Sequence, residues 1–113
     1  MYKRQTPLSA LFVLNDVVFL EAAQALGRTV AGQASIDRDR MTGLFRRFVA
    51  RPPTDAELRT LLDFLAEQRA WAAEHPDEAK KLAGEGNSDA TERAAWTATA
   101  RVLMNLDEFV TKN

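Results

Sequence analysis

The chain of 113 residues has room for one domain with a single core, and too few residues for two. Its 15 basic and 16 acidic residues leave a net charge of −1, which disfavours nucleic-acid binding because that function needs surplus Lys and Arg. The absence of cysteine excludes disulfides, thiolate metal sites and a cysteine nucleophile within this sequence. Because 19 Ala and 13 Leu residues far outnumber the 8 Val and Ile residues, an all-α fold is expected.

Thr6-Pro7 predicts the start of the first helix, since Thr caps free backbone N–H groups and Pro is tolerated at the first helical position. We expect Asn15-Asp16 to end this helix and to cap a second one. The second helix is indicated by apolar residues at helical spacing, and Gly32 is its expected end. These apolar residues are Phe19, Ala22, Ala23, Leu26 and Val30.

A third helix is expected to begin near Ser35 or Asp37 and to end at Arg51-Pro52-Pro53, because proline disfavours helix at the residue before it. Gly43 within it is a candidate for a close contact between helices, at a propensity cost of about 1 kcal/mol. The predicted buried stripe of this helix consists of Met41, Leu44, Phe45, Phe48 and Val49.

Thr54 and Glu57 form a capping box, in which each side chain accepts a hydrogen bond from the other residue's backbone N–H. The helix that starts there carries leucines on one face and is expected to run to about Glu74. Pro76 is predicted to open a short helix that Gly84 closes. Residues 84–89 form the only obvious flexible loop.

The last long helix is expected to start near Asp89, and after Asn105 one further turn should hold Phe109. Its predicted buried residues are Trp96, Thr99, Ala100 and Leu103. The short connections indicate a compact antiparallel or orthogonal bundle of about five helices, with a short C-terminal turn, in a single domain over residues 1–113.

Two similar segments, residues 14–19 and 104–109, are interpreted as helix junctions because acidic residues follow an asparagine in each. The acids around them could converge as paired carboxylates or as a calcium site; they are Asp16, Glu21, Asp107 and Glu108. Capping is the favoured interpretation, since Asn and Asp commonly stabilise helix N-termini. No catalytic, cofactor-binding or metal-binding residue is therefore predicted.

Three further features are candidate sites. The arginines at 38, 40, 46, 47 and 51 could contact phosphate or an acidic partner, but the acids among them favour a solvated face with local ion pairs. His75 is the sole histidine, cannot build a metal site or a triad alone, and is expected to be exposed at a helix end. Trp71 and Trp96 could form a platform for stacking sugars, although core positions are favoured for both.

Three signatures occur in a familiar order along the chain. The first is Thr6-Pro7-Leu8 followed by Leu14-Asn15-Asp16 and Phe19, and the second is Arg51-Pro52-Pro53-Thr54 with Glu57. The third is Ala95-Trp96 followed by Asn105-Leu106-Asp107-Glu108-Phe109. Together they make the chain resemble the C-terminal region of a planctomycete cytochrome c-associated family, domain of unknown function 1553. Val17 stands where that family usually has proline, so a single bent helix over residues 7–31 is the alternative to two helices.

The resemblance implies a large exported parent protein, often with a cytochrome c-like domain, and it transfers no catalytic residue to this chain. Residues 1–20 lack the features of a signal peptide, and no stretch is apolar enough to span a membrane. We therefore expect a non-catalytic helical structural or interaction module, without a cofactor, that binds the rest of its parent polypeptide or a second copy. The alternative is an auxiliary domain that contributes a wall to the active site of a redox or carbohydrate-processing enzyme.

Overall fold

The computed structural model describes the backbone of residues 6–86 and 88–112, and the side chains of residues 18–86 and 88–105. Five helices account for most of it, and no strand occurs among the described residues. They are α1 (Thr6–Ala31), α2 (Asp37–Phe48), α3 (Asp55–Glu74), α4 (Pro76–Ala83) and α5 (Ala90–Lys112). The predicted all-α fold of about five helices is confirmed.

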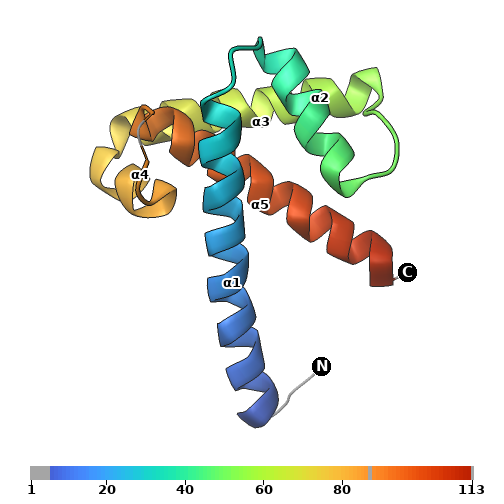
Figure 1. Cartoon of the computed structure of the whole chain (residues 1–113), viewed down its shortest axis with the longest axis vertical. Helices are drawn as coiled ribbons and strands as arrows, with labels where there is room; N and C mark the ends of the chain where they lie inside the picture. Colours follow the sequence, from blue (N-terminus) through green and yellow to red (C-terminus); the bar gives the residue numbers. More distant parts are fainter. Residues whose placement is uncertain (1–5, 87, 113) are drawn as a thin grey trace.

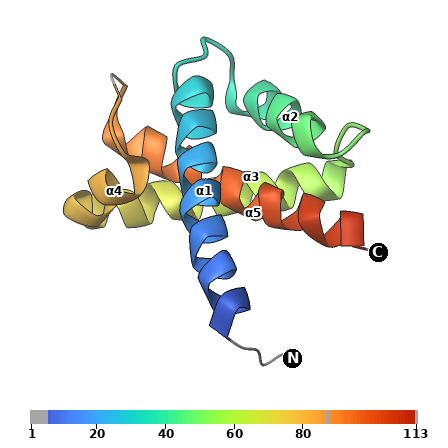
Figure 2. The ribbon, with the colours of Figure 1, turned by 60° about the horizontal axis from the view of Figure 1, so that its bottom comes forward.

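The helix α5 is the centre of the molecule, because it packs against each of the other four. Figure 1 shows α1 crossing α5 steeply, while α3 runs behind α5 and α4 covers one end. The first half of α1 and the last turns of α5 diverge from their crossing, so the start of α1 and the end of α5 lie apart in both ribbon views (Figures 1 and 2). The arrangement is an orthogonal array rather than a parallel-sided bundle.

The core forms where α1, α2 and α3 bring apolar side chains onto α5. Trp96 of α5 is fully buried, as predicted, and lies in one cluster with Phe45 of α2 and Leu65 of α3. Burying an aromatic or leucine side chain of this kind contributes about 1.5–3 kcal/mol. The stripes predicted for α2 and α5 are therefore the faces that hold the helices together.

The predicted breaks at Asn15-Asp16 and after Asn105 are wrong. α1 continues without interruption through Asn15-Asp16 to Ala31, and α5 continues through Asn105 to Lys112, so the expected C-terminal turn is part of α5. Asn and Asp cost less than about 1 kcal/mol in a helix interior, whereas a break needs proline or a competing cap. The alternative of one helix over residues 7–31, which the absence of proline at Val17 suggested, is the correct one.

The helices α1 and α5 approach each other closely where they cross at Gly27. A Cβ atom on Gly27 would collide with Thr97 Oγ1 and would lie only 3.0 Å from the carbonyl oxygen of Arg93. Glycine is therefore required by α5 rather than by the conformation of α1. The close contact predicted for Gly43 is wrong, because a Cβ atom there would meet nothing within 4 Å.

Two predicted helix ends have the expected geometry. Thr54 Oγ1 accepts a hydrogen bond from the Glu57 N–H at 3.1 Å, and Glu57 Oε1 accepts one from the Thr54 N–H at 2.9 Å. Gly84 ends α4 with a φ of +71°, in the left-handed region that favours glycine.

The loop at residues 84–89, expected to be flexible, is held at both ends by Arg93 of α5. The Arg93 side chain donates to the carbonyl oxygens of Ser88 at 3.0 Å and Gly84 at 2.8 Å, and is itself almost fully buried. A buried guanidinium with neutral acceptors is stable only while those hydrogen bonds persist.

Replacing Gly27 by alanine tests the crossing of α1 and α5. Although alanine raises helix propensity by about 1 kcal/mol, we expect Gly27→Ala to lower the free energy of unfolding by about 1–3 kcal/mol, because backbone atoms of α5 must move. Gly43→Ala is the matched control and should raise stability by up to about 1 kcal/mol. Urea denaturation followed by circular dichroism measures both. Equal stabilisation by the two substitutions would contradict the close contact at Gly27.

Candidate functional site

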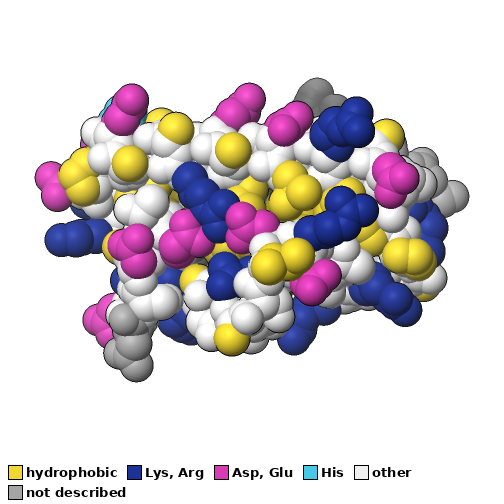
Figure 3. All heavy atoms as spheres, turned by 90° about the horizontal axis from the view of Figure 1, so that it is seen from above, with side chains coloured by type: hydrophobic (Ala, Val, Ile, Leu, Met, Phe, Trp, Pro, Cys, Tyr) yellow, Lys and Arg dark blue, Asp and Glu magenta, His cyan; other side chains and the backbone are white. Residues whose placement is uncertain are grey.

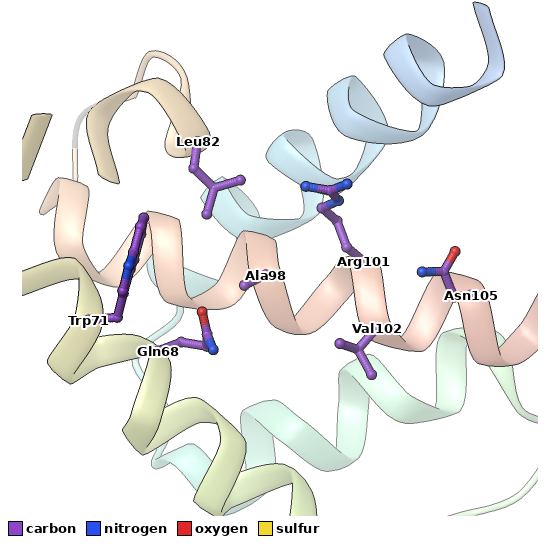
Figure 4. A pocket seen from close by; sticks show the side chains of 7 residues that line it. All are labelled: Gln68, Trp71, Leu82, Ala98, Arg101, Val102 and Asn105. Atoms are coloured by element: carbon purple, nitrogen blue, oxygen red, sulfur yellow. The ribbon is translucent and has the colours of Figure 1, made fainter. Parts of the chain in front are cut away.

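A groove of about 510 Å³ runs along α5 and is bordered by α3 and α4. Figure 4 shows Trp71 of α3 at one end, Leu82 of α4 above it, and Val102 and Asn105 of α5 further along. The remaining lining residues are Gln68, Ala98 and Arg101. The groove therefore combines an apolar end with three polar side chains.

Trp71 is half-buried and is held in place by its neighbour His75. The two rings stack with their centroids 5.1 Å apart and an angle of 18° between planes. His75 Nδ1 also lies 2.9 Å from the carbonyl oxygen of Trp71, which fixes the imidazole on this side of the indole. As predicted, His75 is exposed at the end of α3, but it serves as a support for an aromatic wall.

A second, smaller hollow of about 110 Å³ lies in the angle between α1 and α5. It is lined by Phe19 of α1 and by Arg101, Met104 and Asn105 of α5. Arg101 and Asn105 line both hollows, so the described side chains leave one face of α5 uncovered between α1 and α3. Phe19 and Asn105, which belong to the two similar sequence segments, do approach each other here.

A cluster of four charged side chains joins α2, α3 and α5 on another part of the surface. Arg69 donates two hydrogen bonds to Asp37, at 2.6 and 2.9 Å, and two to Glu92, both at 2.7 Å. Arg40 lies within 4.0 Å of both carboxylates. The hydrogen bonds from Arg69 hold the pKa of Asp37 below its ordinary value and raise the pKa of Arg69. Asp37 and Glu92 are also in the first turns of α2 and α5, where negative charge is favourable.

A second charged cluster surrounds the capping box of α3. Arg51 donates to both oxygens of Glu57, at 2.8 and 2.9 Å, and its guanidinium lies 5.4 Å from the centroid of the Phe45 ring. Hydrogen bonds from Arg51 and from the Thr54 N–H lower the pKa of Glu57 to about 2. Arg51 thus joins the end of α2 to the start of α3.

The solvent face viewed in Figure 3 carries Lys and Arg side chains interleaved with Asp and Glu. Arg38 adds a long-range pair with Asp55 at 3.9 Å. The prediction of a solvated, ion-paired face for the arginine-rich segment agrees with this arrangement. Among the described residues no cluster of three or more His, Cys, Asp or Glu side chains could hold a metal ion.

The residues singled out from the sequence lie in different parts of the structure. Arg51, Thr54 and Glu57 meet in one cluster beside the exposed Pro52, whereas Trp96 is in the core and Phe19 and Asn105 line the hollows at α5. Glu21 is exposed on α1. The side chains of the others lie outside the described residues, so their roles stay predictions; these are Thr6, Pro7, Asn15, Asp16, Asp107, Glu108 and Phe109.

Sequence reasoning missed the groove itself. Trp71, predicted to lie in the core, is partly buried against a small core cluster and also borders the groove. The alternative of a joint platform of Trp71 and Trp96 is wrong because Trp96 is completely buried. The available signal was the spacing of Ala98, Arg101, Val102 and Asn105, which places them on one side of a helix whose other side carries Trp96 and Leu103. The carboxylates that pair with Arg69 lie 32 and 23 residues away in the sequence, so no local sequence pattern indicates these ion pairs.

A comparison with known protein families finds a match over residues 2–65 of the chain. A family model described as "Protein of unknown function (DUF1553)" matches residues 2–65, which span α1, α2 and the first half of α3. Neither a curated protein nor a solved structure matches the chain. Within the described residues, no helix has both the length and the apolar character needed to cross a membrane.

Because Glu57 is paired with Arg51, we expect the fold to lose the stability that this ion pair contributes when the solution is made acidic. Because the folded pKa of about 2 lies below the ordinary value of 4.5, this group stabilises the fold fully above pH 4.5 and loses its contribution as the pH falls toward 2. We expect Glu57→Gln, which keeps an acceptor for the Thr54 N–H, to be less stable than the wild type at pH 6. The difference between the two proteins should shrink as the pH falls to 3, as measured by urea denaturation midpoints. A pH-independent difference would contradict the assigned ion pair.

Proposed function

The chain belongs to the DUF1553 family of proteins of unknown function, and from this premise we propose that it is a non-catalytic helical module that docks onto other protein surfaces. Its partner is the rest of a larger parent polypeptide or a second copy of the chain. The resemblance to planctomycete cytochrome c-associated proteins supports an exported parent. The observation that carries the proposal is the uncovered face of α5, which lines two adjoining hollows.

The apolar side chains near this face support a docking role. Val102 remains 40% exposed on α5 and lines the larger hollow. Half-buried Phe19, Met104 and Trp71 border the same region. Contiguous apolar surface that a chain leaves exposed is commonly the place where another protein packs.

The pairing of the charged groups with one another supports a structural rather than a catalytic role. Each group whose pKa is clearly shifted pairs with another charge across a helix junction: Asp37 with Arg69, and Glu57 with Arg51. Shifted pKa values mark catalytic sites only when the groups also face a cleft where substrate can bind. These pairs connect α2 to α3 and α5. Glu57 also borders a hollow of about 300 Å³ beside Phe45, but both of its carboxylate oxygens accept hydrogen bonds from Arg51.

A single substitution in the groove tests this docking role. We expect Val102→Glu to weaken self-association of the chain, or its binding to the remainder of its parent polypeptide, by at least about tenfold, because it places a charge in the apolar contact. Glutamate has a better helix propensity than valine, so α5 should be retained. Ile36→Glu is the matched control, since Ile36 is 66% exposed and does not line the groove.

Sedimentation velocity of the chain alone, and of its mixture with the remainder of the parent polypeptide, measures the effect. Docking through α5 would be contradicted if the wild-type chain stayed monomeric and also failed to bind the remainder. Equal effects of the two substitutions would contradict it as well.

One observation favours the second candidate, an auxiliary wall of a redox or carbohydrate-processing active site. Trp71 borders the groove together with Gln68 and Arg101, a set that can stack on a sugar ring and bond its hydroxyls. If this role is correct, neutral oligosaccharides should change the intrinsic fluorescence of the wild type, and Trp71→Phe should abolish the change. Unchanged fluorescence at millimolar oligosaccharide would exclude a sugar subsite formed by this chain alone.

A further inference from the structure

The uncovered face of α5 has the geometry of a helix-binding surface. Ala98, Arg101, Val102 and Asn105 occupy positions i, i+3, i+4 and i+7, the spacing by which one helix packs along another. The small side chain of Ala98 lets a neighbouring backbone approach closely. Figure 4 shows that these residues follow α5 lengthwise, so the groove is elongated along a helix axis.

The apolar end of the groove is already organised for a partner. Trp71 has His75 stacked against it, and the carbonyl of Leu82 accepts a hydrogen bond from Gln24 of α1 at 2.9 Å, which holds the end of α4. An aromatic wall that is fixed before binding loses little conformational entropy when a partner arrives. Apolar side chains of a partner would therefore anchor at this end.

The charge of the groove is one-sided. Its seven described lining residues include the cation Arg101 and no acid. Arg101 is exposed and forms no ion pair with a described carboxylate, whereas four arginines of α2, α3 and their connection are paired; these are Arg38, Arg40, Arg51 and Arg69. A guanidinium in this position is complementary to a carboxylate on the partner.

We propose that the groove binds an acidic amphipathic helix of the partner protein, with Asp or Glu on Arg101 and apolar side chains on Trp71, Leu82 and Val102. This inference rests on the proposed docking role and adds the chemistry of the partner. The amides of Gln68 and Asn105 satisfy polar groups at the rim of the contact. Recognition of this kind places apolar anchors at helical spacing in a hydrophobic groove.

A pair of synthetic helices tests the charge complementarity. Each is an alanine-based helix of about 18 residues with Leu at i, i+4 and i+7, and it carries either Glu or Lys at i+3. They are titrated by calorimetry against the wild-type chain, Arg101→Glu, and the control Arg47→Glu, which makes the same charge reversal at an exposed position of α2. Trp71 fluorescence locates binding at the groove, because Trp96 is fully buried, and Trp71→Phe identifies that signal.

The wild type and Arg47→Glu should bind the Glu helix about tenfold more tightly than the Lys helix, and Arg101→Glu should invert the preference. If neither helix binds the wild type, the proposal is wrong. If both bind equally and Val102→Glu abolishes binding, the docking role stands but the acidic partner is wrong. If only oligosaccharide changes Trp71 fluorescence, the groove is a sugar subsite and the proposal is again wrong.

Discussion

The close crossing of α1 and α5 at Gly27 is the constraint on which the rest of the structure depends. With no Cβ on Gly27, the backbone of α1 reaches Thr97, whose hydroxyl is buried without a conventional hydrogen-bond partner among the described residues. A Cα hydrogen of Gly27 faces that oxygen instead, an interaction of modest strength. The stability of the crossing comes instead from the packing on either side of Gly27, where Ala23 and Val30 of α1 join the cluster around Trp96. Any larger residue would separate the two helices and open this core.

The other helices are attached to this crossing by different means. α2 is held by Met41, Leu44 and Phe45 on its buried face and by ion pairs near its two ends. Partly exposed pairs contribute little singly, but Arg69 bonds two carboxylates with paired hydrogen bonds and so defines the positions of three helices at once. α4 is joined through Ala79 and Ala83, whose small side chains pack against Ala72 and Ala94. Apolar burial supplies the stability, and the ion pairs determine the orientation.

The local features of the fold could be predicted from the sequence, whereas the long-range ones could not. The capping box at Thr54, the proline start and glycine end of α4, and the buried stripe through Trp96 depend on neighbouring residues and are confirmed. The breaks expected at Asn15 and Asn105 failed because a capping residue inside a helix is tolerated when packing favours continuation. Gly27 and Gly43 differ only in what lies opposite them, which helix periodicity does not reveal. The groove was missed for the same reason, since its walls come from α3, α4 and α5.

The same contacts that stabilise the fold also fix the walls of the groove. α5 divides its surface between a buried side that includes Trp96 and Leu103 and an open side that includes Arg101 and Val102. The buried side cannot rotate without dismantling the crossing at Gly27, so the open side is held in a constant direction. The walls are fixed independently, by the His75–Trp71 stack at the end of α3 and by the hydrogen bond from Gln24 to the end of α4. In the docking that we propose, mainly the long side chain of Arg101 would have to be ordered, so affinity would depend on charge and shape.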